Sequence, residues 1–257
     1  MNLRHQTILI TGGTSGLGLE FAAQLLALGN TVLLTGRDPA RLAQVLERLP
    51  QVHTFQSDVS DPAAIAQLFE QVTTRFPKLS VLINNAGQMR KLDLQASVQQ
   101  VPDLTRELDV NLAGPMRMVQ QFLPHLLRQP AAAILNVSSG LALTPYPLAP
   151  VYGASKAGLR AYTRALRVQL QDTRVQVFEL VAPAAKTPLN DAFAGDVAEK
   201  DLMAPRPLIA QTLRAMEANR WEVYPGIAAM LRLLSRVAPG FLLRQLSKGL
   251  RESLARG

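Results

Sequence analysis

The chain has 257 residues, of which 48% are hydrophobic and 18% charged, and it contains no cysteine. This composition can bury a sizeable core and excludes a disordered chain, and the missing cysteine excludes disulfides, thiolate metal sites and a cysteine nucleophile. The net charge is +8, yet six of 27 basic residues and one of 19 acidic residues fall in the last 31 positions, and aromatic residues make up 5%. We therefore expect a cytoplasmic protein that is not a general nucleic-acid binder.

Short apolar runs alternate with longer segments of helical periodicity along the chain. The runs predict seven strands, at residues 7–10, 31–34, 52–55, 81–83, 133–137, 175–180 and, more weakly, 221–224. Apolar strands joined by helices, such as those expected over 17–28 and 158–170, are typical of a parallel sheet covered on both faces. We therefore expect an α/β fold with a single doubly wound (Rossmann) domain over 1–226, about seven parallel strands and helices on both faces. A basic helical extension is expected over 227–257.

The first predicted strand runs directly into a glycine-rich turn that opens a helix. The turn reads Thr11-Gly12-Gly13-Thr14-Ser15-Gly16-Leu17-Gly18. Glycines there let backbone amides approach a pyrophosphate, and the positive end of the helix favours the anion. Because tight strand-to-helix turns need glycine in any case, the position in the first βαβ unit is what favours a dinucleotide site. The expected cofactor contacts are Gly12, Thr14, Ser15, Gly16, Leu17 and Gly18.

The spacing Thr-Gly-x-x-x-Gly-x-Gly resembles that of the short-chain dehydrogenase/reductase family, and further motifs agree. Asp58-Val59 follows the third strand, where the family holds the adenine ring, and Asn84-Asn85-Ala86-Gly87 follows the fourth and matches a family signature. The resemblance covers essentially the whole chain, and it implies that Asp58, Val59, Asn85, Ala86 and Gly87 contact the cofactor. The tail from residue 227 is similar to that of the bacterial DltE-like subgroup.

The end of the second strand bears on the choice of nicotinamide cofactor. It reads Leu34-Thr35-Gly36-Arg37-Asp38, so the acid that usually binds the ribose in NAD enzymes is replaced by uncharged Thr35. Arg37 can pair with a 2′-phosphate, which favours NADP(H). Two alternatives stay open. Arg37 is a solvated residue before a helix that Asp38 caps and Pro39 starts, or Asp38 reaches a ribose hydroxyl and NAD(H) binds.

Tyr152 and Lys156 lie four residues apart on one face of a predicted helix. A free tyrosine titrates at about 10, and a neighbouring ammonium is expected to lower that pKa. The resemblance implies that Tyr152 transfers the proton, that Lys156 tunes Tyr152 and binds the nicotinamide ribose, and that Asn111 supports the proton relay. Ser139 lies 13 residues before Tyr152, the spacing of the family's serine, and is expected to hold the substrate oxygen, with Ser138 as the alternative.

One motif departs from the family. After the sixth strand the family has Pro-Gly-x-x-x-Thr, which holds the nicotinamide carboxamide. With Thr187 in the threonine position, Ala182-Pro183 replaces Pro-Gly, which removes the freedom of glycine and one backbone N–H. Thr187 is still expected to contact the nicotinamide. The three histidines, His5, His53 and His125, are too scattered for a metal site.

These residues predict an NADP(H)-dependent oxidoreductase that interconverts a carbonyl and a secondary alcohol. The alternative is a dinucleotide-binding sensor or scaffold without turnover, which should have lost Tyr152, Lys156 or Ser139. The pocket walls are expected at 88–94, at 141–151 and in a mobile loop over 188–207. The second wall is apolar and contains three prolines, which favours a hydrophobic substrate. The resemblance further implies a homodimer or homotetramer built on helices over 102–123 and after Tyr152.

The basic tail predicts two short helices on either side of Pro239-Gly240. Apolar residues such as Met230, Leu234 and Phe241 recur there among arginines and lysines. One interpretation is that the apolar stripe covers the substrate pocket or a second subunit, with its charges solvated. The other is that it makes a peripheral contact with an anionic membrane, at the inner face.

Overall fold

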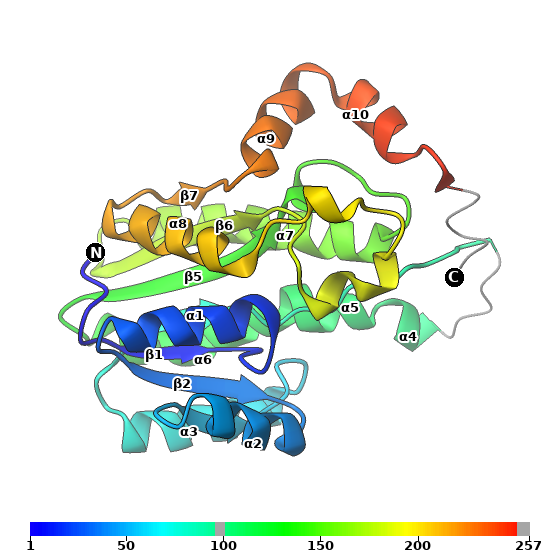
Figure 1. The fold of residues 1–257 in the computed structure, drawn as a ribbon. Helices are drawn as coiled ribbons and strands as arrows, with labels where there is room; N and C mark the ends of the chain where they lie inside the picture. Colours follow the sequence, from blue (N-terminus) through cyan, green and yellow to red (C-terminus); the bar gives the residue numbers. More distant parts are fainter. Residues whose placement is uncertain (96–100, 251–257) are drawn as a thin grey trace.

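Seven parallel strands form one sheet in the order β3-β2-β1-β4-β5-β6-β7. The computed structural model describes residues 1–95 and 101–250 (Figure 1). The strands are β1 Thr7–Ile10, β2 Thr31–Gly36, β3 His53–Gln56, β4 Leu79–Asn84, β5 Ala132–Ser139, β6 Val175–Ala182 and β7 Glu222–Val223. All seven predicted strands are present. Most extend beyond their apolar runs, whereas β7 keeps only two residues.

Helices cover both faces of this sheet. They are α1 Gly16–Ala27, α2 Pro39–Arg48, α3 Pro62–Arg75, α4 Val101–Leu104, α5 Arg106–Leu108, α6 Gly114–Leu127, α7 Pro150–Gln169, α8 Pro205–Glu217, α9 Ile227–Val237 and α10 Pro239–Leu246. Helices α1, α2 and α8 pack on one face, and α3, α6 and α7 pack on the other. The expected doubly wound α/β architecture is therefore confirmed.

Alternation along the buried strands produces two separate cores. Ile8 and Ile10 of β1 enter the core beneath α1, α2 and α8, whereas Leu9 between them enters the core beneath α3, α6 and α7. This is the period of two that a strand imposes on its side chains. Because both faces are covered by helices, apolar residues fill nearly every strand position, which is why the strands appear in the sequence as continuous apolar runs.

The helix expected over 102–123 is not continuous. Short α4 and α5 are followed by a π-helical turn, Asp109–Ala113, and only then by α6. Pro115 has no N–H to donate to the carbonyl four residues earlier, so the regular α-helical ladder cannot pass through this point. π-Turns inside helices frequently occur at functional sites, and this one contains Asn111.

The segment 188–207, expected as an irregular loop, has local structure. It contains two 3₁₀ helices, Pro188–Phe193 and Glu199–Asp201, and its last three residues begin α8. Phe193 is buried against Leu148 and Tyr152, and the backbone of Met203 pairs with Ala184 and Lys186. The segment is thus packed on the domain at several points.

The two short helices expected in the tail are α9 and α10, which meet at Ala238 and Pro239. They form an arch beyond β7, coloured orange to red in Figure 1. The last basic residues of the tail, Arg251 and Arg256, lie outside the described residues.

Candidate active site

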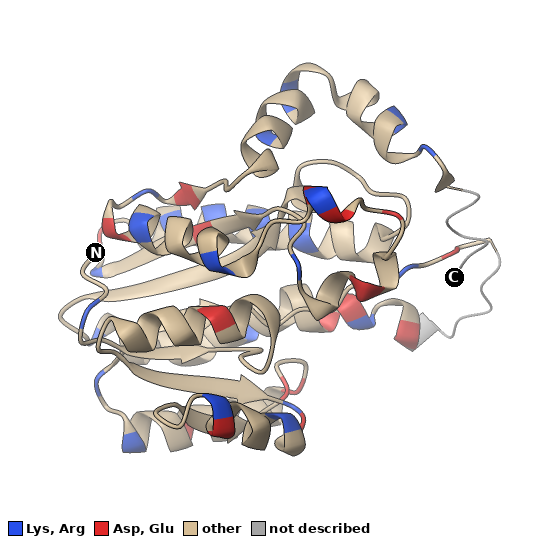
Figure 2. Cartoon of the chain, in the orientation of Figure 1, with Lys and Arg blue, Asp and Glu red and all other residues tan. Residues whose placement is uncertain are grey.

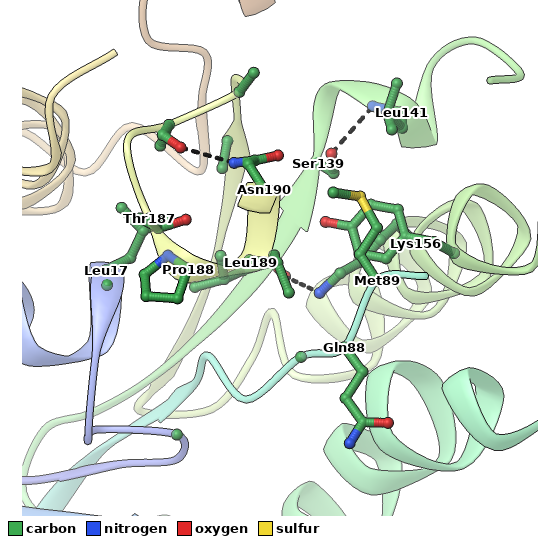
Figure 3. Close-up of a pocket in the computed structure, with 18 of the residues that line it drawn as sticks. Leu17, Gln88, Met89, Ser139, Leu141, Lys156, Thr187, Pro188, Leu189 and Asn190 are labelled. Carbon is green, nitrogen blue, oxygen red and sulfur yellow. Dashed lines mark hydrogen bonds between the residues drawn. The ribbon is translucent and has the colours of Figure 1, made fainter. Parts of the chain in front are cut away.

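A cavity of about 700 Å³ opens at the carboxyl ends of the strands. Its walls come from the turn after β1, the end of β2, the segment after β4, the end of β5, the start of α7 and the segment after β6. β1 and β4 are neighbours in the sheet, and the strand order reverses between them. In doubly wound folds dinucleotides bind at this reversal. The close-up in Figure 3 looks into the cavity, with Leu17 and Thr187 on one side and Met89 and Ser139 on the other.

The glycines of the first turn are required by its backbone. Gly12 and Gly16 have φ values of +65° and +54°, which disfavour any side chain. A Cβ atom on Gly12 would lie 2.7 Å from the Cα atom of Ala86, and one on Gly18 would overlap the carbonyl oxygen of Gly12. The turn therefore brings bare backbone and the N-terminus of α1 to the cavity wall. This cradle fits a pyrophosphate, as the glycine spacing predicts.

The turn after β1 is tied to the segment after β4. The Asn85 side chain donates hydrogen bonds of 3.0 Å to the carbonyl oxygens of Thr11 and Gly12. In return, the Thr11 hydroxyl accepts from the backbone N–H groups of Asn85 and Ala86 at 3.0 and 3.1 Å. In the absence of ligand, Asn85 therefore positions the turn. Ala86 and Gly87 line the cavity itself.

Charged residues gather where β2 ends. The Arg37 guanidinium lies 3.7 Å from the Asp58 carboxylate, and with the Gln88 amide oxygen turned toward it, Arg37 donates to that oxygen at 2.8 and 2.9 Å. Asp38 caps α2, because its carboxylate accepts from the N–H groups of Ala40 and Arg41 at 2.9 and 3.3 Å. This cap agrees with the Asp38-Pro39 pattern of the sequence.

The predicted pair Asp58 and Val59 lines the cavity. One carboxylate oxygen of Asp58 accepts from the backbone N–H and the hydroxyl of Ser60, which holds the turn after β3 in place. Arg41 also lines the cavity, with its guanidinium 3.6 Å from Asp38. Arg41 was not predicted from the sequence, although its position one helical turn after Asp38 places it on the side of α2 that faces the cavity.

Tyr152 and Lys156 project from the first turns of α7 into the cavity, and both are buried. The Lys156 ammonium lies 5.7 Å from the centre of the Tyr152 ring and donates a 2.9 Å hydrogen bond to the carbonyl of Val137. Burial raises the pKa of Tyr152 to about 12, against the opposing effect of the Ser139 hydroxyl. Burial also lowers the pKa of Lys156 to about 8.

The pKa of Tyr152 thus lies above its ordinary value, opposite to the direction expected from the neighbouring Lys156. Desolvation is the largest cause, and the negative charge of Glu107 acts in the same direction. The four-residue spacing in the sequence predicts proximity but carries no information about burial.

The two adjacent serines at the end of β5 have different partners. Ser138 donates a 2.5 Å hydrogen bond to the carboxylate of Glu179, a fully buried residue of β6. The Ser139 hydroxyl accepts from the Leu141 N–H at 3.2 Å and favours the ionised form of Tyr152. Ser138 is therefore engaged by the sheet, whereas Ser139 lies beside Tyr152.

Asn111 lies in the π-turn before α6, and its side chain is fully buried. Its amide donates to the carbonyl of Gln88 at 2.8 Å and to the hydroxyl of Ser155 at 3.1 Å, and its oxygen accepts from the Gln88 N–H at 2.8 Å. A Cβ atom on Gly87 would lie 3.4 Å from the Asn111 oxygen and 3.6 Å from the Lys156 ammonium. The position beside Gly87 is thus bordered by both Asn111 and Lys156, and Gly87 and Lys156 line the cavity.

Thr187 lies across the cavity from Lys156. A Cβ atom on Gly16 would lie 3.2 Å from the Thr187 side chain, so the segment after β6 closes over the glycine-rich turn. Ala182 ends β6 as the partner of Ser139 in the sheet, and Pro183 follows at the cavity wall. The replacement of Pro-Gly therefore leaves Thr187 at the predicted position in the wall.

Sequence analysis missed a group of buried charges next to the site. Arg160, one turn after Lys156 on α7, lies 2.8 Å from the Glu179 carboxylate and donates to the Tyr224 hydroxyl at 2.7 Å. Burial raises the pKa of Glu179, while Ser138 and Arg160 act in the opposite direction. The available signal was Glu179 itself, which is the only charged residue in an otherwise apolar predicted strand.

A second missed residue is Glu107 of α5, which is fully buried. Its carboxylate accepts from the Arg90 N–H at 2.9 Å, and burial raises its pKa. Its negative charge also raises the pKa of Tyr152. Within the described residues, no group of three or more metal-ligating side chains is present.

Comparison with known proteins agrees with this site. Residues 6–197 match the family model described as short chain dehydrogenase. An uncharacterized oxidoreductase DltE of Bacillus subtilis is 43% identical over 190 residues, 74% of this chain and 75% of that protein. Sulfoacetaldehyde reductase 2 of Chromohalobacter salexigens is 34% identical over 239 residues, 85% of this chain and 93% of that protein.

Solved structures give the same result. A short chain dehydrogenase/reductase of Burkholderia phymatum in complex with NAD has a TM-score of 0.82 at 25% identity, covering 92% of this chain and 95% of that one. A short chain dehydrogenase of Burkholderia cenocepacia in complex with NADP has a TM-score of 0.82 at 26% identity, covering 96% and 99%. These neighbours support a nicotinamide dinucleotide cofactor. The chain belongs to the short-chain dehydrogenase/reductase family and is an oxidoreductase of that type.

Proposed function

We propose that this protein is an NADP(H)-dependent reductase of hydrophobic ketones or aldehydes, with Tyr152 as the proton donor. The proposed preference for NADP(H) rests on the contacts of Asp38 and Arg37, which follow β2. Asp38 is engaged in capping α2, so it is a poor partner for a ribose hydroxyl. Arg37 lines the cavity with its guanidinium partly exposed, and such a group binds a 2′-phosphate through two parallel hydrogen bonds.

The proposed proton transfer uses the side chains of Ser139 and Tyr152, which both line the cavity. When bound, the nicotinamide supplies or accepts the hydride. Ser139 holds the substrate oxygen by donating a hydrogen bond to the charge that develops on it. Tyr152 gives its phenolic proton to that oxygen in the reducing direction. The raised pKa of Tyr152 keeps the phenol protonated at neutral pH, which is the form that reduction requires.

Lys156 and Asn111 support Tyr152 from the side of the cofactor. The ammonium of Lys156 stabilises the phenolate that forms when the proton leaves, and it binds the nicotinamide ribose. Asn111 holds the backbone of Gln88 with two hydrogen bonds and lies, like Lys156, beside Gly87, where it would support the proton relay. The contacts of Lys156 and Asn111 and the family membership of the chain support these roles.

The preference for hydrophobic substrates rests on the wall opposite the cofactor cradle. Leu148, Phe193, Met89 and Tyr146 pack together around Tyr152, and burial raises the pKa of Tyr146 to about 12, so its phenol stays neutral. An apolar wall with few polar groups is typical of sites for hydrophobic ligands. One relative is named as an aldehyde reductase, which supports a carbonyl as the reacting group.

The test is a panel of aliphatic and aromatic ketones and aldehydes, with sugars for comparison, assayed by the loss of NADPH absorbance. Tyr152→Phe should reduce turnover by at least about 100-fold, the scale of general acid catalysis, and leave NADPH affinity within about twofold because only the proton donor is removed. Tyr162→Phe, on the same helix but packed in the core, is the matched control. Substantial turnover by Tyr152→Phe would contradict the role, and NADPH binding without turnover of any carbonyl would favour a sensor.

A further inference from the structure

Helices α9 and α10 have an inner face that covers the substrate side of the cavity. Ala228 is buried, and a Cβ atom on Gly140 would lie 3.1 Å from the Leu231 side chain. Leu231 and Leu246 line the cavity. The Arg232 guanidinium lies over the Tyr224 ring at 4.5 Å, which fixes the rotation of α9 about its axis. The opposite stripe of α9 must therefore face away from the domain.

The outer face of these helices is apolar and exposed. Met230, Leu233 and Val237 recur at three- and four-residue spacing on α9, with 51%, 62% and 69% of their surface exposed. Phe241 and Leu243 continue the exposed apolar surface on α10. Of the eleven large apolar residues exposed in residues 1–95 and 101–250, six lie on these two helices. Burial within the domain, the first interpretation of the tail, explains the apolar residues of the inner face. It does not explain the exposed apolar residues of the outer face.

The charge on the same segment has a single sign. Residues 227–250 contain Arg232, Arg236, Arg244 and Lys248 and no aspartate or glutamate. Figure 2 shows blue and no red along the arch of α9 and α10, whereas α2 carries both colours. An exposed apolar stripe flanked by cations is the pattern of helices that lie in the interface of an anionic membrane.

We infer that the outer face of α9 and α10 docks this protein on an anionic lipid bilayer. A second copy of the chain fits this face less well, because a symmetric contact would bring the exposed cations Arg236 and Arg244 of each copy together. No helix in the described part of the chain is long and apolar enough to cross a membrane, so the contact is peripheral. Because Leu231 and Leu246 of the same two helices line the cavity, docking also holds the cavity close to the bilayer, where lipophilic carbonyl compounds partition.

The experiment measures co-sedimentation of the full-length protein with vesicles. Vesicles of phosphatidylglycerol and phosphatidylcholine should bind it, vesicles of phosphatidylcholine alone should bind it much more weakly, and added salt should weaken binding. The double variant Arg236→Glu/Arg244→Glu should weaken binding at least about tenfold, from roughly fivefold per cation near such a surface. Leu233→Ser/Val237→Ser should weaken it by about tenfold or more, since the apolar stripe no longer inserts.

Helix α2, far from the arch in Figure 1, offers matched controls. Leu46 and Arg48 are exposed there, and Leu46→Ser and Arg48→Glu should leave vesicle binding unchanged. NADPH affinity, measured in every variant, verifies that the fold is intact. Vesicle binding is also independent of the proposed reductase activity, which is tested separately with a water-soluble carbonyl compound and without vesicles. Absence of binding to anionic vesicles at low salt overturns the inference, as does equal binding to both vesicle types. A change of molecular mass in Leu233→Ser/Val237→Ser shows instead that copies of the chain meet at this face.

Discussion

Replacing Arg37 by alanine should weaken NADPH binding and leave NADH binding nearly unchanged. Arg37 follows β2 at the rim of the cavity, and 49% of its side chain is exposed. Its ion pair with Asp58, at 3.7 Å, is long and solvated, so losing it costs less than about 1 kcal/mol of folding stability. The variant therefore reports on the cofactor rather than on the fold.

The size of the effect follows from the exposure of the guanidinium. A hydrogen bond between charged groups contributes about 1.5–3 kcal/mol, and because half of the Arg37 side chain is in solvent, the lower end of that range applies. About 1.5–2 kcal/mol corresponds to a Kd for NADPH that is roughly 10- to 30-fold higher. NADH has no 2′-phosphate, so its Kd should change by less than about twofold.

Calorimetric titration of both cofactors, at low and high salt, measures this difference. The NADPH affinity of the native protein should fall with salt, and that of Arg37→Ala should fall less, because one phosphate contact is missing. Arg48→Ala, on α2 but away from the cavity, controls for the loss of a positive charge. Equal losses for NADPH and NADH would show that Arg37 does not bind the 2′-phosphate and would refute the assignment.

Four further predictions concern pH dependence, cofactor binding, stability and oligomeric state. Because the pKa of Lys156 lies at about 8, below its ordinary value, the ammonium is lost as pH rises through that value. The kcat/KM for NADPH-dependent reduction should fall there, and Lys156→Arg should move this limb upward. Gly18→Ala should weaken binding of either cofactor by about 1–3 kcal/mol through overlap with Gly12, seen in the same titrations. Glu179→Ala should lower the free energy of unfolding by about 1–3 kcal/mol, because it removes the nearest carboxylate of buried Arg160, which keeps only Glu222 at 3.5 Å and the Tyr224 hydroxyl. A loss below about 1 kcal/mol in urea would contradict this. Light scattering at micromolar concentration should give a dimer or tetramer, and a monomer would refute the association implied by the family.

The strand positions could be predicted because apolar runs mark residues buried on both faces. The strand ends could not. β2, β4 and β5 each continue into polar residues that a sequence reading assigns to loops. In the structure Asn84 pairs with Asn136 across the sheet, and Ser139 pairs with Ala182. These polar ends border the cavity, so strand length was underestimated where the sheet meets the site.

The same distinction applies to the chemistry of the site. Spacing along a helix predicts that Tyr152 and Lys156 are neighbours, because residues four positions apart lie on the same face of a helix. The pKa of Tyr152, by contrast, depends on distant segments, because Phe193 after β6 packs in the same cluster and the negative charge of Glu107 on α5 raises the pKa. The break in the helix at Asn111 could be predicted only in part. Pro115 indicates that the helix is interrupted, but it does not specify a π-turn.

A residue distant in the sequence, Glu179, bears on which of Ser138 and Ser139 is available to a substrate. Adjacent residues of a strand point to opposite faces of the sheet, but both serines reach the cavity wall because β5 ends there. Glu179 on the neighbouring strand removes the ambiguity. Its buried carboxylate needs hydrogen-bond donors, and Ser138 and Arg160 are the ones it finds. With its proton donated to Glu179, Ser138 has none to offer a substrate oxygen, and Ser139 keeps its hydroxyl beside Tyr152.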